Sequence, residues 1–284
     1  MLFNANNNND YTYDAIVVGS GISGGWAAKE FCEKGLKTLV LERGKPLNHG
    51  EYKTEWDNPW DVPNRGLESQ EAKKRQYRQS QCGPYHEEAA HHFIDDVDAP
   101  YTNPEEKPVL WIRASHMGGR SVIWGRQSYR WSPMDFEANE KDGIAIPWPI
   151  GYDDLKPWYA YVEKFAGISG SKENLPHLPD SDFLPPMDLN CVEQEIKEKI
   201  EKQFKGRKMI IGRTAHLTQP HNGRGQCQSR NRCMRGCSYG AYFSSLSATL
   251  PAAPETGNLT IRPNSLVERV VYDKNTGLAT GVHV

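Results

Sequence analysis

Short apolar runs separated by long polar stretches mark this chain, and the first two runs enclose a glycine-rich turn. Residues 15–18 (AIVV) and 38–41 (TLVL) are apolar, and the segment between them has the composition of a helix. Apolar runs of this length, bounded by turn residues, are typical of buried parallel strands. Residues 13–43 therefore predict a strand, a glycine turn, a helix and a second strand, in the order of a dinucleotide-binding βαβ unit.

The glycines of this turn match the needs of a bound dinucleotide. Gly19 permits the tight turn, Gly21 lets the backbone approach a pyrophosphate, and Gly24 lets the helix pack close to the strand. The start of the helix supplies unpaired N–H groups and the positive end of the helix dipole. Glu42 follows about 20 residues later, where an acid accepts hydrogen bonds from an adenosine ribose. These features predict an α/β Rossmann-type fold and leave NAD and FAD open.

The rest of the pattern predicts a long insertion and a return to strands. Residues 45–108 are polar and rich in aromatic and charged side chains, with a helical stretch expected over 68–79. A connection this long is usually functional, and we interpret it as an inserted region that covers a cofactor or docks a partner. A short apolar strand then meets a second glycine pair, Gly118 and Gly119. Further on we expect a turn and a short amphipathic helix within 148–165, and helices over 192–204 and 244–253. Residues 169–190 are expected to be irregular, and strands are expected over 259–262, 266–272 and 280–284.

Local signals predict where some of these elements begin and end. Asp153 or Asp154 is expected to cap the helix over 148–165. A turn is expected at residues 273–277, between the last two strands. The sequence stops inside the last predicted strand, which we interpret as the sign of a fragment.

Composition excludes several functional classes. The chain of 284 residues carries 34 basic and 36 acidic side chains, so its charge predicts no nucleic-acid partner and no capture by an anionic membrane. No apolar run approaches the roughly 20 residues that a membrane span needs, so no direct membrane insertion is expected. Residues 1–12 are polar and rich in asparagine, without the features of a secretory signal, and we interpret them as a disordered leader.

Three of the six cysteines are clustered as Cys227-x5-Cys233-x3-Cys237. Without a secretory signal, a disulfide framework is not the first expectation, and a tight cluster favours metal chemistry. Iron–sulfur clusters are held by thiolates at short spacings, and three thiolates suit a three-iron four-sulfur (3Fe–4S) cluster. Zinc would require a fourth ligand, which His216 or His221 could supply. Three free thiols are the remaining interpretation.

Several separate patches of the chain resemble the glucose–methanol–choline (GMC) flavin oxidoreductases. The branch that looks most similar is that of the large FAD subunits of bacterial gluconate, glucose and related sugar dehydrogenases. The resemblance covers nearly the whole chain but only about the first half of a typical member. The patches are residues 17–25, 41–44, 113–121, 148–159, 227–243 and 259–284.

The resemblance implies FAD as the cofactor and assigns residues to it. The first glycine loop would hold the pyrophosphate, Glu42 the ribose, and the second glycine loop the flavin and ribityl-phosphate side, with the backbone of Val267 at the adenine edge. Ile123 stands where some pyranose-oxidising relatives carry a histidine bonded to the flavin, so the FAD is expected to be non-covalent. His116 does not match that position, and we interpret it as a structural loop histidine. The implied cofactor-binding residues are Gly19, Gly21, Gly24, Gly25, Glu42, Arg43, Gly118, Gly119, Ser121 and Val267.

The resemblance also implies a reaction and an organisation of the chain. The donor would be a CH–OH group of a sugar, polyol or sugar acid, with hydride passing to FAD and electrons to a 3Fe–4S cluster and then to a haem or quinone acceptor. The implied partners are a small subunit and a haem or cytochrome subunit. Residues 13–284 would form the N-terminal FAD-binding portion, with a substrate-side and cysteine-loop insertion over 148–243 and a return to the FAD domain over 244–284. The catalytic histidine region of the family would lie beyond Val284, so no catalytic residue is assigned and the fragment alone is expected to be inactive.

Two other functions fit parts of the sequence. The chain could be a non-catalytic flavin-binding, electron-transfer or docking module. An NAD-linked dehydrogenase with a zinc loop would share the first glycine turn but would leave Gly118, Gly119 and the later strands unexplained. A cytoplasmic location is the first expectation, and export to the periplasm with a partner subunit is the alternative that the resemblance implies.

Overall fold

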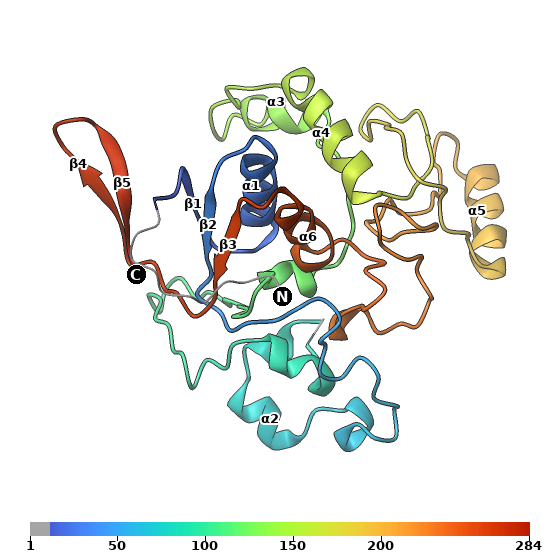
Figure 1. The fold of residues 1–284 in the computed structure, drawn as a ribbon. Helices are drawn as coiled ribbons and strands as arrows, with labels where there is room; N and C mark the ends of the chain where they lie inside the picture. Colours follow the sequence, from blue (N-terminus) through green and yellow to red (C-terminus); the bar gives the residue numbers. More distant parts are fainter. Residues whose placement is uncertain (1–11, 84) are drawn as a thin grey trace. The chain divides into compact units, whose positions relative to one another are not determined.

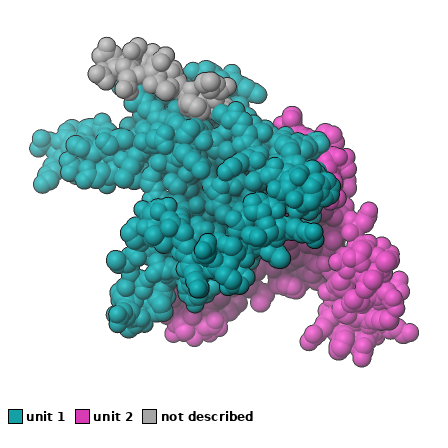
Figure 2. Space-filling model, turned by 90° about the horizontal axis from the view of Figure 1, so that it is seen from below, with its two compact units in different colours: residues 1–124, 230–240, 244–284 teal, residues 125–229, 241–243 magenta. Residues whose placement is uncertain are grey.

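A computed structural model describes residues 12–83 and 85–284, and the expected leader lies, apart from Thr12, outside this range. Contacts divide the described chain into two units, coloured separately in Figure 2. The first unit holds the described residues up to Trp124, together with Arg230–Gly240 and Ser244–Val284. The second unit holds Gly125–Ser229 and Ala241–Phe243.

The first unit is built on a parallel three-stranded sheet (Figure 1). Strands β1 (Ala15–Val18) and β2 (Thr38–Leu41) flank helix α1 (Ile22–Glu33), which confirms the predicted strand–turn–helix–strand unit. Strand β3 (Leu259–Arg262) pairs with β2 on the side away from β1, so the order is β1-β2-β3. Every residue of β2 is buried, as expected for the middle strand of a covered parallel sheet.

Helix α1 packs against β1 and β2 and also against a helical segment that precedes β3. That segment, predicted as a helix over 244–253, is a π-helix over Ser245–Thr249 that continues into α6 (Leu250–Ala252). Gly25 of α1 faces it, and a methyl group there would lie 3.0 Å from Ser245 Cβ and closer still to Thr249 Oγ1. The missing side chain at Gly25 therefore permits close packing between the two helices.

The long polar region contributes to the same hydrophobic core as the sheet. Tyr52, Tyr85 and Phe93 are buried in one cluster with Val40 and Ile261. The helix expected over 68–79 is shorter, because α2 (Gln70–Arg75) begins after Ser69, whose hydroxyl accepts the N–H of Ala72 at 3.0 Å. The first unit also contains short 3₁₀ helices over Pro63–Gly66, Gln79–Gln81, Glu87–His92, Gly119–Val122, Cys233–Arg235 and Pro254–Thr256.

The last two strands form a separate antiparallel hairpin (Figure 1). Strand β4 (Arg269–Asp273) pairs with β5 (Leu278–His283), close to the predicted bounds. The Asp273 carboxylate accepts hydrogen bonds from Asn275 N at 2.8 Å and Thr276 Oγ1 at 3.0 Å, and these bonds close the turn at the predicted place.

The second unit contains three helices among its described residues, α3 (Pro133–Lys141), α4 (Tyr152–Ala166) and α5 (Cys191–Gln203). The sequence did not predict α3. The N-cap residue of α4 is Gly151, and the predicted Asp154 caps the helix from its first turn, where its carboxylate accepts the Gly151 N–H at 2.8 Å. Residues 169–190 are irregular, as predicted.

No helix in the described ranges is both long enough and apolar enough to cross a bilayer.

Candidate cofactor site

The first glycine loop joins the carboxyl end of β1 to the start of α1. Gly19 has a φ of 91°, a left-handed conformation that favours glycine, and its N–H donates to Leu41 O at 2.8 Å. A methyl group on Gly24 would lie 2.9 Å from the Gly19 carbonyl carbon and closer still to its oxygen, so the helix can approach the loop only with glycine there. No side chain caps α1 at Gly21, and the first turn carries no acid. The N–H groups at this helix start therefore remain available to an anionic ligand.

Glu42 lies at the end of β2 and is fixed by three hydrogen bonds. The side chain is 8% exposed. Its Oε2 accepts from Ser20 N at 2.9 Å and Ser20 Oγ at 2.6 Å, and its Oε1 accepts from Gly44 N at 2.6 Å. A carboxylate oxygen has two lone pairs, so Oε1 retains one for a further donor such as a ribose hydroxyl. The ribose-binding role of Glu42 stays a prediction, and Oε1 is the atom that could perform it.

The second glycine loop contacts the first. Gly118 and Gly119 have φ values of 80° and 50°, and a methyl group on Gly119 would lie 3.5 Å from Gly21 Cα. The Gly118 N–H donates to Ser20 Oγ at 3.0 Å, which links this loop to the serine that holds Glu42. The two loops thus meet at Gly21 and Gly119, which are both partly exposed, so a single ligand could touch both, whereas Gly118 is buried against Leu246.

The Ser121 side chain stabilises the second glycine loop by hydrogen bonds. It is buried, donates to Gly118 O at 2.6 Å and accepts the Ser245 N–H at 3.0 Å. The hydroxyl therefore connects the glycine loop to the π-helix, and any contact of Ser121 with a cofactor would add to this role.

The chain after β3 returns to the same edge of the sheet. Asn264 N donates to Gly44 O at 2.9 Å, and Ser265 N donates to Glu42 O at 2.8 Å. Val267 follows and is partly buried, whereas the Arg43 side chain is exposed. The structure therefore brings the predicted adenine-side segment to the carboxyl ends of the strands, where α/β sheets bind ligands.

The three clustered cysteines fall in both units. Cys227 belongs to the second unit, whereas Cys233 and Cys237 belong to the first, and all three are partly exposed and outside any disulfide bond. Across residues 12–83 and 85–284, no three His, Cys, Asp or Glu side chains are grouped so that they could hold a metal ion. The 3Fe–4S cluster therefore stays a prediction.

The two histidines considered as a fourth zinc ligand are engaged elsewhere. His216 Nδ1 lies 2.7 Å from Thr214 Oγ1, and His221 Nε2 lies 2.7 Å from Lys164 O. Burial, with the neighbouring Arg126, lowers the pKa of His216 to about 4. These contacts give no support to the zinc alternative.

A buried histidine cluster in the first unit was not predicted. The ring centroids of His91 and His92 are 4.1 Å apart, and those of His92 and His116 are 5.1 Å apart. Burial and positive neighbours lower the pKa of His91 to about 4 and that of His92 to about 3, and burial also lowers the pKa of His116. The charged groups that face the cluster are Lys45, Lys53 and Glu42.

Acidification should destabilise the protein through this cluster. A histidine that is neutral in the folded state takes up a proton on unfolding, so its contribution is complete above the unfolded pKa of about 6.5 and falls as pH drops toward the folded value. For His92 the loss by pH 4 is on the order of 3 kcal/mol. Urea unfolding across this range measures the slope, which His92→Gln should reduce and His283→Gln, at an exposed position, should not. An unchanged slope in His92→Gln would contradict the assignment.

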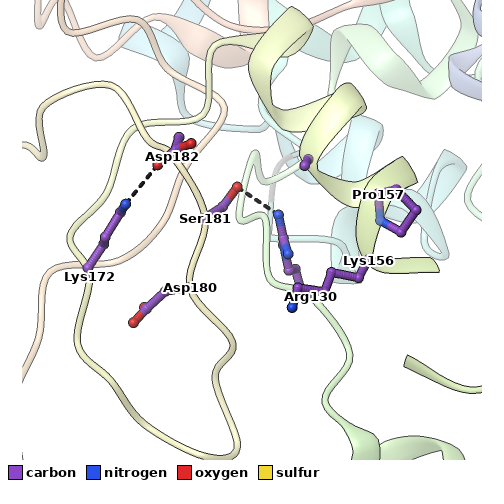
Figure 3. Close-up of a pocket in the computed structure, with 8 residues that line it drawn as sticks. Arg130, Lys156, Pro157, Lys172, Asp180, Ser181 and Asp182 are labelled. Carbon is purple, nitrogen blue, oxygen red and sulfur yellow. Dashed lines mark hydrogen bonds and ion pairs between the residues drawn. The ribbon is translucent and has the colours of Figure 1, made fainter. Parts of the chain in front are cut away.

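The second unit contains a cavity of about 480 Å³ between α4 and the irregular loop, with several charged residues among its lining (Figure 3). Arg130 lies at its wall and donates to Ser181 Oγ at 2.6 Å, and Lys172 is paired with Asp182 at 2.7 Å. Asp180 also lines the cavity and pairs with Arg213. Because these lining charges are largely paired with protein groups, the cavity offers no evident general base.

The geometry of the first unit defines a dinucleotide-binding α/β protein, since two glycine loops and a fixed acid meet at the carboxyl ends of parallel strands. The family model for GMC oxidoreductase matches residues 13–284. The chain therefore belongs to the GMC oxidoreductase family, which confirms the resemblance and the predicted FAD-binding fold class. Family membership supports FAD over NAD, the choice that the glycine turn left open.

Three relatives align with nearly all of this chain, and the aligned part is less than half of each relative's own length. The chain is 25% identical over 273 residues to the fructose dehydrogenase large subunit of Gluconobacter japonicus, covering 94% of this chain and 47% of that protein. It is 26% identical over 269 residues to paromamine 6'-oxidase of Streptomyces fradiae, covering 93% and 42%. A solved structure of formate oxidase from Aspergillus oryzae RIB40 gives a TM-score of 0.45 at 14% identity, over 95% of this chain and 41% of that one. The chain thus spans less than half of the length of these curated relatives.

Proposed function

We propose that this chain is the FAD-binding portion of an oxidoreductase that oxidises a CH–OH group of a sugar, polyol or sugar acid. The observation that carries the proposal is the contact between the two glycine loops beside the fixed carboxylate of Glu42. FAD, when bound, supplies the hydride acceptor. The donor class is supported by relatives whose names include fructose dehydrogenase and paromamine oxidase.

The chain's own groups would bind and orient the cofactor. The N–H groups at the start of α1 would receive the pyrophosphate, and Oε1 of Glu42 would accept a ribose hydroxyl. Gly118 and Gly119 would let the backbone lie against the flavin side without a side chain between them. None of the described residues is assigned the proton transfer that alcohol oxidation requires.

The electron acceptor is proposed to be a protein partner rather than oxygen. The name of the Gluconobacter relative specifies a large subunit, which supports a further subunit as a partner of the full-length protein. A haem or cytochrome subunit is the second partner that we propose. The three clustered cysteines, Cys227, Cys233 and Cys237, are proposed to hold a 3Fe–4S cluster as part of this system.

Flavin content tests the cofactor. The purified full-length protein should be yellow. Acid precipitation should release the flavin, because the Ile123 side chain cannot form a covalent bond to it. A sugar or polyol donor should bleach the flavin absorbance under anaerobic conditions, because the donor reduces the flavin. A flavin that binds but is reduced by no CH–OH donor would favour the docking-module alternative. A colourless, folded protein that takes up no added FAD would refute both.

Iron analysis tests the cluster separately. Anaerobic purification of the full-length protein should give iron and acid-labile sulfide, and both should be lost in Cys233→Ser while flavin content is kept. Cys191→Ser is the matched control, because Cys191 is exposed at the start of α5 and outside the cysteine triple. Zinc without sulfide, or no metal at all, would overturn the cluster and leave the flavin proposal standing.

A further inference from the structure

One fully buried carboxylate anchors the loop of residues 230–240, called the cysteine loop here. Glu55 has no exposed surface. Its oxygens accept the Ser238 N–H at 2.9 and 3.0 Å, accept the Ser238 hydroxyl, and pair with the Arg230 guanidinium. All of these donors come from the cysteine loop, so one acid distant in sequence binds the loop near both of its ends. A buried carboxylate is tolerated only with such a set of partners.

Two further arginines of the loop bind the same region of the chain. Arg232 donates to the Glu55 backbone carbonyl at 2.9 Å. Arg235 donates to the backbone carbonyls of Thr54 and Asp57, both at 3.2 Å, and to the Glu88 carboxylate at 2.8 Å. These bonds join the loop to the rest of the first unit without the participation of any thiol.

Arg230 connects this anchor to a sulfur atom. Its side chain pairs with Glu55 and lies close enough to Cys237 for the two groups to interact electrostatically. The guanidinium also lies 4.7 Å from the Trp56 ring and 4.9 Å from the Tyr239 ring, within the range of cation–π attraction. Three contacts, with Glu55, Trp56 and Tyr239, therefore restrict the Arg230 side chain beside the thiol.

The backbone next to Cys237 is equally restricted. Gly236 has a φ of 102°, and a methyl group there would lie 2.6 Å from Tyr52 Cδ2 and closer still to Cγ. The glycine therefore lets the loop pass over the face of a buried tyrosine. The packing of Gly236 against Tyr52 therefore restricts the backbone next to Cys237.

We propose that Glu55 is the positioning residue of the cysteine loop. Its carboxylate fixes Ser238 and Arg230, and through them the orientation of the Cys237 sulfur, before any group binds there. This inference concerns the protein alone. Its consequence for iron loading rests on the cluster proposed above.

Hydrogen exchange of the full-length protein tests the anchor directly. Glu55→Gln removes the charge that Arg230 and Ser238 share, and the peptide containing Ser238 should exchange about tenfold faster or more. Peptides from β2 should keep their wild-type rates. Glu51→Gln, an exposed acid of the same segment, is the matched control and should change neither. Ser238→Ala removes only the hydroxyl donor and should give a smaller increase in the exchange rate. This variant tests the anchor if Glu55→Gln unfolds the protein.

A double-variant cycle distinguishes positioning from a general loss of stability. Arg230→Met should also accelerate exchange of the peptide that contains Ser238. In the double variant Glu55→Gln/Arg230→Met, the fold-increase in exchange rate should be smaller than the product of the two single fold-increases, because both changes remove the same ion pair. Arg230→Lys should restore part of the protection. Independent effects that multiply, or wild-type exchange in Glu55→Gln, would overturn the proposal.

Iron content adds a functional measurement to the same proteins. If the wild type carries iron, Glu55→Gln should lose most of it and keep its flavin, and Arg230→Lys should retain more iron than Arg230→Met. Iron retained at wild-type levels in a Glu55→Gln protein whose loop exchanges fast would show that the anchor does not position the thiol. A wild type without iron would refute the cluster alone, since the exchange experiment does not depend on it.

Discussion

Gly24→Ala is expected to abolish flavin binding and to destabilise the first unit. The new methyl group would overlap the Gly19 carbonyl, a backbone group that cannot rotate away. Either α1 moves off the loop or the loop loses its turn, and overpacking of this kind costs on the order of 3 kcal/mol. Flavin absorbance per protein and the midpoint of urea unfolding measure the two effects.

Two matched glycine variants separate packing from ligand contact. Gly281→Ala in β5 places its methyl group in open space and should change neither measurement. Gly21→Ala also meets nothing within 4 Å, so it should fold normally yet lose flavin if the pyrophosphate lies against this backbone. Normal flavin content in Gly21→Ala would move the cofactor away from the first glycine loop.

Glu163→Ala is expected to be the most damaging change in the second unit. Arg130 is 5% exposed and donates through Nε and Nη2 to Glu163, with the shortest bond at 2.6 Å. Tyr152 and Ser181 also accept from this guanidinium, but neither carries a compensating charge. Removing the carboxylate leaves a buried cation unpaired, which costs about 3–5 kcal/mol. Chemical unfolding followed by tryptophan fluorescence measures the loss.

The exposed ion pair of α3 supplies the control for this prediction. Glu137 pairs with Lys141 at 2.7 Å, and both side chains are more than half exposed. Glu137→Ala should therefore cost no more than about 1 kcal/mol. Similar unfolding midpoints for the two alanine variants would show that water reaches Arg130 and that the pair is not isolated.

The parts of the fold that depend on local sequence were predictable. The unit around α1 follows from apolar runs, glycines and an acid within 31 residues, and the structure contains each element at the expected place. Helix α3 was missed because Phe136 is its single buried residue, so no apolar period marks it. Its start was nevertheless signalled by Ser132, Pro133 and Asp135, a capping box with proline at the first helical position.

The parts that depend on distant contacts were not predictable. No local pattern shows that Ser20, an unspecified position of the glycine turn, would bond both Glu42 and Gly118. The same holds for the anchoring of the cysteine loop by Glu55, which is 175 residues from Arg230. The three cysteines are close in sequence, but the chain passes from one unit to the other between Cys227 and Cys233. The spacing of the cysteines alone does not reveal this change of unit.

The position of β3 in the sheet delays completion of the sheet during translation. Strand β2 can pair with β1 as soon as both have left the ribosome, but its other edge must wait for β3, roughly 200 residues later. At about 5–20 residues per second, that delay lasts on the order of 10 s or more. During this time an apolar strand edge stays open to pairing with other nascent chains. The protein should therefore depend on holding chaperones during translation, more than its small sheet alone would suggest.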